Sequence, residues 1–196
     1  MKIAFSGGPH SGKSAVLMLL EKRLVSEKKN RVVFVPEAAS EILSKGKLHP
    51  LANPYEFQRE VLKKQLESED RVGTEECLHR VFDRAIPDAY TYLPRDQAGR
   101  LLQETMGESA NLPSVLKRYD ACLFFDTYYA GHISSGNKQR VETSFEDLMD
   151  LSQKTLNVWK HHPRLLVVPS AFATIEEKTD YVAKIMNQLL REKMFV

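Results

Sequence analysis

The sequence of 196 residues predicts an α/β fold built on a mostly parallel sheet. Short apolar runs alternate along the chain with longer segments whose apolar residues recur at helical spacing, which is typical of strand–helix units. Residues 122–125 (Cys-Leu-Phe-Phe) and 165–168 (Leu-Leu-Val-Val) are apolar throughout, as expected for strands buried on both faces. The length suits one domain and no repeat or linker divides it, so we expect a single domain over residues 1–196.

Five short segments have the composition of strands. They are residues 2–6, 31–35, 78–83, 120–126 and 164–168. The third segment is the least regular, because His79 and Arg80 interrupt its apolar run.

Helices are predicted between these strands by apolar residues at three- and four-residue spacing. The first is expected over residues 14–27. Asn53-Pro54 marks the start of another, with asparagine as the cap and proline in the first turn. Residues 143–146 and 174–177 both read Thr-x-x-Glu, the spacing of a capping box, so each is expected to begin a C-terminal helix.

The composition excludes several classes of protein. A formal net charge of +2 is too small to favour nucleic acid as the main partner. No apolar run approaches the roughly 18 residues of a membrane-spanning helix, and we expect no signal peptide, because residues 3–5 run directly into a glycine loop. Cys77 and Cys122 lack the spacing of a metal site, so we interpret them as reduced thiols and expect a cytoplasmic protein. The sequence carries no signal for the oligomeric state.

Residues 7–14 (Gly-Gly-Pro-His-Ser-Gly-Lys-Ser) match the phosphate-loop pattern G-x-x-x-x-G-K-[ST] in full. Glycines allow backbone N–H groups to approach phosphate oxygens, and the helix that follows presents further N–H groups and its positive dipole end. Lys13 would place a charge on the outer phosphates, and Ser14 would offer a hydroxyl to Mg²⁺. The predicted nucleotide-binding residues are Gly8, Pro9, His10, Ser11, Gly12, Lys13, Ser14 and Ala15.

Acidic residues follow several of the predicted strands. In a parallel sheet the ligand site lies at the carboxyl ends of the strands, so these side chains are eligible for it. Asp83, followed by Arg84, is our candidate for the metal carboxylate, with Asp126 as the alternative. Glu37 could accept a proton from an acceptor hydroxyl or hold the acceptor in place, or else serve only the dipole of its helix.

A polar segment at about residues 127–145 separates the fourth strand from the next helix. It contains glycines and ends in a basic cluster with Arg140. Such a segment could be a lid that closes an arginine onto the phosphates, or simply a basic loop.

Four segments together resemble the NadR-like AAA domain family of P-loop proteins. They are residues 5–14, 35–39 (Val-Pro-Glu-Ala-Ala), 82–88 (Phe-Asp-Arg-Ala-Ile-Pro-Asp) and 140–143. The phosphate loop is shared by many proteins, whereas the second and third segments are more specific. The resemblance implies a three-layer P-loop NTPase fold, in which a five-stranded parallel sheet carries helices on both faces.

The resemblance also implies roles for particular residues. Glu37 matches by position the base of related deoxynucleoside kinases, and Asp83-Arg84 matches a pair that serves Mg²⁺ and phosphate. Arg140 would be the lid arginine, and an adenine would lie near residues 169–173. The catalytic set implied in this way is Lys13, Glu37, Asp83, Arg84 and Arg140, with Ser14 and Asp83 on the metal.

Two classes of function fit these observations. The first is an ATP- and Mg²⁺-dependent kinase-like enzyme that acts on a small nucleoside- or nucleotide-like acceptor. The second is a regulatory nucleotide-binding switch that hydrolyses slowly and has no small acceptor. Residues 137–140 (Asn-Lys-Gln-Arg) begin like the guanine-reading motif of GTPases but end in arginine, which favours ATP without excluding GTP.

Overall fold

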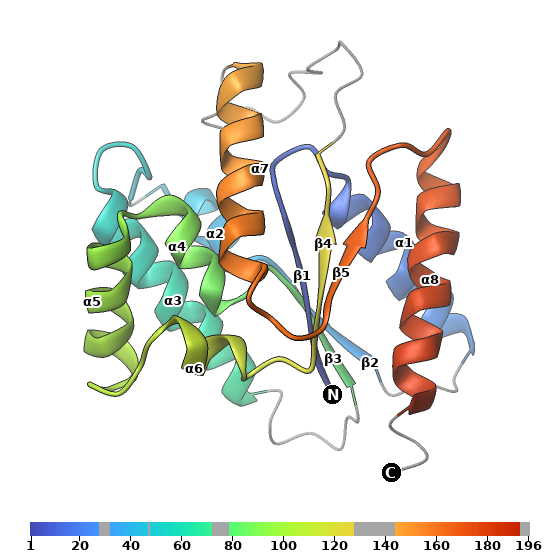
Figure 1. Cartoon of the computed structure of the whole chain (residues 1–196), viewed down its shortest axis with the longest axis horizontal. Coiled ribbons are helices and arrows are strands. Elements are labelled where there is room, and N and C mark those ends of the chain that lie inside the picture. Colours follow the sequence, from blue (N-terminus) through green and yellow to red (C-terminus); the bar gives the residue numbers. More distant parts are fainter. Residues whose placement is uncertain (28–31, 47, 72–78, 128–143, 193–196) are drawn as a thin grey trace.

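Five parallel strands form one sheet through the middle of the molecule (Figure 1). The computed structural model describes residues 1–27, 32–46, 48–71, 79–127 and 144–192. The strands are β1 (Lys2–Gly7), β2 (Val32–Val35), β3 (His79–Asp83), β4 (Ala121–Phe125) and β5 (Leu165–Val168). Their spatial order is β2-β3-β1-β4-β5. The prediction of five parallel strands is confirmed. Most strand ends lie one residue from their predicted position, and the others coincide with it.

The central strands are buried on both faces, which explains their continuous apolar sequence. β1 pairs with β3 on one side, where Ile3 lies opposite Val81, and with β4 on the other, where Ile3 lies opposite Ala121. Successive residues of β1 then face opposite sides of the sheet, so that Ile3 and Phe5 enter one core cluster while Ala4 enters another.

Two helices, α1 (Lys13–Glu27) and α8 (Ile175–Glu192), cover the first face of the sheet (Figure 1). α1 presents Val16 and Leu20 to the strands, and α8 presents Val182 and Met186. All four side chains are almost fully buried, so this interface forms the larger apolar cluster among the described residues.

The second face is covered by α7 (Phe145–Trp159) and by two short helices, η2 (Ile86–Asp88) and α4 (Ala89–Tyr92). Trp159 at the end of α7 is fully buried and packs edge-on against Tyr119 at 5.7 Å between ring centroids. With helices on both faces, the chain has the three-layer architecture expected of a P-loop NTPase.

Further helices form a layer that extends beyond the sheet, on the left in Figure 1. They are α2 (Ala38–Ser44), α3 (Pro54–Arg71), α5 (Arg95–Met106) and α6 (Leu112–Leu116). α3, α5 and α6 share a separate apolar cluster that contains Leu62, Leu101 and Val115. None of the helices in the described part of the chain combines the length and apolarity needed to cross a membrane.

The helix starts differ in detail from the predicted capping boxes. α7 is capped by Ser144, whose side chain accepts a hydrogen bond from the N–H of Asp147 at 3.1 Å, and Thr143 lies outside the described residues. Ser144 takes this role because its backbone is extended, as an N-cap requires. At α8, Thr174 does accept from the N–H of Glu177, as predicted, but the Glu177 carboxylate accepts from the N–H of Ala173 instead of Thr174.

Candidate functional site

The phosphate loop runs from the end of β1 to the start of α1, at the carboxyl edge of the sheet. Two of its glycines are required by close packing. A Cβ on Gly7 would lie 2.2 Å from the carbonyl oxygen of Phe125, and a Cβ on Gly8 would lie 2.4 Å from the hydroxyl of Thr127. The loop therefore lies directly against the end of β4, and only glycine permits this approach.

Two further loop residues have a left-handed backbone. Gly12 has φ 81° and His10 has φ 58°. Glycine adopts this conformation at little cost, whereas histidine does so with some strain, which is a common property of functional loops. His10 thus contributes to the curvature of the loop through its backbone.

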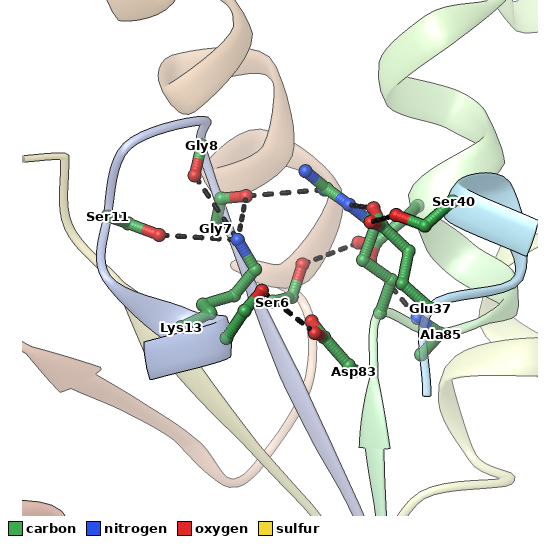
Figure 2. Close-up of polar contacts among 12 residues, drawn as sticks. Ser6, Gly7, Gly8, Ser11, Lys13, Glu37, Ser40, Asp83 and Ala85 are labelled. Carbon is green, nitrogen blue, oxygen red and sulfur yellow. Dashed lines mark hydrogen bonds and ion pairs between the residues drawn. The ribbon is translucent and has the colours of Figure 1, made fainter. Parts of the chain in front are cut away.

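Lys13 points back into the hollow of the loop (Figure 2). Its ammonium donates to the carbonyl oxygens of Gly7 and Gly8, at 3.4 and 3.3 Å, and to the hydroxyl of Ser11 at 3.3 Å. Burial, together with the nearby charge of Arg84, lowers the pKa of Lys13 to about 8. These contacts are long for a charged donor, so the ammonium is available to stronger acceptors such as phosphate oxygens.

Ser14 and Asp83 meet at the start of α1 and the end of β3. The Ser14 hydroxyl donates to the Asp83 carboxylate at 3.1 Å. Burial raises the pKa of Asp83 above its ordinary value, although the Lys13 charge opposes this. Two hard oxygen ligands fit Mg²⁺, which completes its octahedron with water and phosphate oxygens, so this pair could hold the metal without a larger acidic cluster. No group of three or more metal-ligating side chains occurs in the described ranges.

Glu37 and Arg84 form an ion pair beside the phosphate loop. The Arg84 Nε donates to Glu37 at 2.6 Å, and the other Glu37 oxygen accepts from the Ser40 hydroxyl at 2.7 Å. Burial by itself would raise the pKa of Glu37, but Arg84 and Ser40 outweigh it and the pKa lies below the ordinary value. The guanidinium also donates to the Gly7 carbonyl oxygen at 3.3 Å and lies 5.5 Å from the Tyr92 ring centroid.

The backbone places Arg84 in an unusual conformation, with φ 68°. Its N–H donates to the carbonyl oxygen of Phe5 at 2.9 Å, which ties the turn after β3 to β1. Asp88 stabilises this turn. Its carboxylate accepts hydrogen bonds from the N–H of Ala85 at 3.1 Å and from the Trp159 indole N–H at 2.7 Å. A third bond comes from the Ser6 hydroxyl at 2.5 Å. Asp88 is therefore fully engaged in holding Arg84 in place.

A cation that the sequence analysis did not single out lies on the outer side of the loop. The buried Lys178 of α8 donates to the carbonyl oxygen of Ser11 at 2.8 Å and lies over the rings of Phe125 and Phe172. Its one sequence signal is that it falls on the apolar stripe of α8, between Ile175 and Val182.

Asp126, the alternative candidate for the metal carboxylate, does not contact Ser14. It accepts from the N–H of Thr127, it contributes to the electrostatic environment of Lys178, and it does not line the cavity beside the loop. Asp83, and not Asp126, therefore contacts Ser14 in this structure.

A cavity of about 1000 Å³ extends from the phosphate loop to the layer of α3 and α4. At the loop it is lined by the predicted residues, namely Pro9, His10, Ser11, Gly12, Lys13, Ser14, Ala15, Glu37, Asp83 and Arg84. Its far wall is formed by α3, by Thr91 and Tyr92 of α4, and by residues of α7. The size is at the upper end of the range of roughly 300–1,000 Å³ for ligand sites, so it can hold more than the phosphates alone.

Arg140 and most of the lid segment at 127–145 fall outside the described residues, as does the stretch 137–140. Residues 169–173 are described but are not part of the cavity lining, so the adenine position stays a prediction. Phe57 and Tyr92 line the cavity, whereas the nearby Arg59 and Tyr90 do not.

The glycine-rich loop between β1 and α1, with its lysine and the Ser14–Asp83 pair, defines the class: this is a P-loop nucleotide-binding protein with an NTPase fold. The family described as AAA domain matches residues 2–178, and the chain belongs to that family. The match extends from β1 to Lys178 and so includes the whole site. No curated protein matches the sequence.

Proposed function

We propose that this protein transfers the terminal phosphoryl group of Mg²⁺-ATP to a hydroxyl of a small nucleoside- or nucleotide-like acceptor. The observation that carries this proposal is the continuity of one cavity, which begins at Lys13 and Ser14 and reaches beyond Glu37 to α3. A protein that only hydrolyses a nucleotide needs water beside the phosphates, whereas a transferase needs a second compartment next to them. The narrower resemblance to the NadR-like branch agrees with this proposal.

In the proposed reaction a hydroxyl oxygen of the acceptor forms a bond to the γ-phosphorus. The bond from this phosphorus to the β–γ bridging oxygen breaks, and ADP leaves. The hydroxyl proton passes to a carboxylate oxygen of Glu37. Mg²⁺, when bound at Ser14 and Asp83, would supply charge neutralisation for the phosphates.

The ion pair with Arg84 defines what Glu37 can do. A carboxylate with a lowered pKa is ionised at neutral pH, and so it can accept a hydrogen bond from the acceptor hydroxyl and hold its oxygen in line with the phosphorus. Arg84 keeps the carboxylate at the edge of the cavity and adds a cation next to Gly7. Lys13 and Arg140, the arginine of the predicted lid, would stabilise the charge of the transferred group.

The test is a screen of hydroxyl-bearing nucleosides, nucleotides and cofactor precursors for acceptor-dependent ADP release. We expect at least one compound to stimulate turnover, and Glu37→Gln to reduce the stimulated rate by about 10²–10⁴-fold. The matched control is Glu41→Gln, which changes a carboxylate of α2, the helix that begins after Glu37; Glu41 does not line the cavity, so the rate should stay unchanged. If no acceptor stimulates turnover, while exchange of ATP or GTP for its diphosphate alters the conformation, the regulatory switch is the correct class.

A further inference from the structure

The turn that carries Arg84 is held through the two backbone amides that follow it. Arg84 has a left-handed backbone, with φ 68°, and the N–H groups of Ala85 and Ile86 come next along the chain. The N–H of Ala85 donates to the buried Asp88, and the N–H of Ile86 donates to the hydroxyl of Tyr119 at 3.0 Å. A left-handed conformation in a residue other than glycine persists only where its surroundings fix it, so both amides contribute to the position of Arg84.

Tyr119 connects this turn to Glu69, near the end of α3. Its hydroxyl donates to one carboxylate oxygen of Glu69 at 2.6 Å, and Ile86, Tyr119 and Glu69 are all almost fully buried. A phenol has a single proton and the Ile86 N–H can only donate, so the Tyr119 proton is directed to Glu69. Burial and the Glu69 charge raise the pKa of the Tyr119 hydroxyl well above its ordinary value, which keeps it a donor at neutral pH.

Glu69 is ionised although it is buried. Its other carboxylate oxygen accepts from the Lys2 ammonium at 2.8 Å and from the Arg118 guanidinium at 2.9 Å. Burial by itself would raise the pKa of Glu69, but the hydrogen bonds from Lys2 and Tyr119 outweigh it, and the pKa lies below the ordinary value. Glu69 is thus a buried charge with both oxygens engaged, which is a strong and directional acceptor for Tyr119.

Glu69 also belongs to the helix that forms one wall of the cavity. Leu62 and Gln65 of α3 line the cavity, and Glu69 is the next residue on the same helical face. Glu69 itself does not line the cavity. The bridge through Tyr119 therefore joins the cavity helix to the turn that carries Arg84.

We propose that Glu69 is a positioning residue for the nucleotide site, because through Tyr119 it holds Arg84 in place. Arg84 in turn donates to Glu37 and to the phosphate loop, so loss of the bridge would let the guanidinium move away from both. This inference goes beyond the proposed transfer reaction. The contacts that carry it are made within the protein and do not depend on which acceptor is used.

The first experiment measures hydrogen exchange at Arg84 by NMR. Tyr119→Phe removes the hydroxyl and keeps the ring, which packs edge-on against Phe82 and Trp159. In this variant we expect the Ile86 amide and the Arg84 Nε–H to exchange about ten-fold faster than in the wild type, because a buried hydrogen bond that restrains the turn is lost. The Arg84 signal is identified by its absence in Arg84→Lys.

Two further variants separate positioning from general stability. Lys2→Met removes an ion-pair partner of Glu69 and leaves the hydrogen bond from Tyr119 in place, so it should lower stability without changing exchange at Arg84. Glu69→Gln should act like Tyr119→Phe, because its amide can accept from Tyr119 only with its NH₂ group turned toward Lys2 and Arg118. Wild-type exchange at Arg84 in Tyr119→Phe or in Glu69→Gln, or equally fast exchange in Lys2→Met, would overturn the inference.

A double-mutant cycle connects the bridge to function. Mg²⁺-dependent ATP consumption is measured for the wild type, Tyr119→Phe, Arg84→Ala and the double variant, under conditions in which circular dichroism shows each to be folded. We expect Tyr119→Phe to lower the rate about ten-fold in the wild type and to have no further effect in Arg84→Ala, since it acts only through Arg84. Additive losses would overturn the inference, because they would give Tyr119 a structural role alone. A wild-type protein that consumes no ATP with any acceptor would contradict the transfer reaction, while hydrogen exchange would still decide the role of Glu69.

Discussion

The ammonium of Lys178 on α8 donates a hydrogen bond to the carbonyl oxygen of Ser11 in the phosphate loop, at 2.8 Å. The Ser11 carbonyl and the Gly12 N–H belong to one planar peptide and point in opposite directions. Because the peptide is rigid, a contact that holds the Ser11 carbonyl also restrains the Gly12 N–H, so we expect Lys178 to influence anion binding at the loop.

Lys178→Met is expected to weaken ATP binding by about ten-fold, because one charge-assisted hydrogen bond that orients the loop is lost. Methionine keeps the length of the apolar stem, so packing against Phe125 and Phe172 should remain. Lys184→Met, an exposed position on the same helix, is the control. Calorimetric titration with Mg²⁺-ATP measures both, and equal affinities for wild type and Lys178→Met would show that the contact is only structural.

ATP affinity is expected to fall as the pH rises above about 8, where the buried Lys13 loses its proton in the free protein. Phosphates bind the charged ammonium more strongly than the neutral amine, so affinity falls when Lys13 loses its proton. Because the pKa of Lys13 is lowered, this loss begins at a lower pH than it would for an ordinary lysine. Since one proton is linked to binding, affinity should drop by up to about ten-fold per pH unit. The measurement is a set of dissociation constants between pH 7 and pH 9.5.

Lys13→Ala provides the control for this profile. It should bind ATP about ten- to hundred-fold more weakly at pH 7, and its affinity should no longer decline with pH over the same range. A wild-type profile that is flat to pH 9.5, or an alanine variant that keeps the slope, would assign the titration to another group.

Asp83→Asn is expected to raise the Mg²⁺ concentration needed for half-maximal turnover and to lower turnover more than ATP binding. The reason is that asparagine can still accept the hydrogen bond from Ser14 but lacks the charge that holds the cation. Asp126→Asn is the matched comparison, since Asp126 follows β4, on the other side of β1 from β3, and does not line the cavity. A shift of the Mg²⁺ midpoint in Asp126→Asn alone would move the metal site to Asp126.

Asp88→Asn is expected to lower the free energy of unfolding by roughly 2–4 kcal/mol, because an amide cannot accept all three hydrogen bonds from Ser6, Ala85 and Trp159. Urea unfolding, followed by the fluorescence of the single tryptophan, reports directly on this network. Asp96→Asn, an exposed position on α5, should stay within about 0.5 kcal/mol of wild type. An Asp88→Asn protein as stable as wild type would contradict the bracing role.

The sequence reveals most of the fold, because its signals are local. Apolar runs without alternation predict buried parallel strands, and each of the five is found within about a residue of its expected place. The phosphate loop could be read in the same way, because its glycines, lysine and serine act within eight consecutive residues. Asp83 and Glu37 were found by their positions after strands, since the carboxyl ends of parallel strands meet at one edge.

The strand order β2-β3-β1-β4-β5 was decided by the tertiary structure alone. It puts β3 directly beside β1, which brings Asp83 to Ser14 although they are 69 residues apart, and it sends Asp126 to the other side of the loop. Local sequence patterns do not indicate which strands are neighbours in the sheet. The same limit applies to Asp88, because only the tertiary structure brings its carboxylate to the N–H of Ala85 and to the indole of Trp159.

The sequence by itself therefore determined the fold class, the phosphate loop and the positions at which acidic residues reach the sheet edge. Packing decided the roles of the residues that act at a distance, such as Lys178 on the loop and Arg84 on Glu37. The physical reason is the range of the interactions. Backbone curvature and helix dipoles are set by neighbours in sequence, whereas the pairing of charges and the walls of a cavity depend on which distant segments are brought into contact.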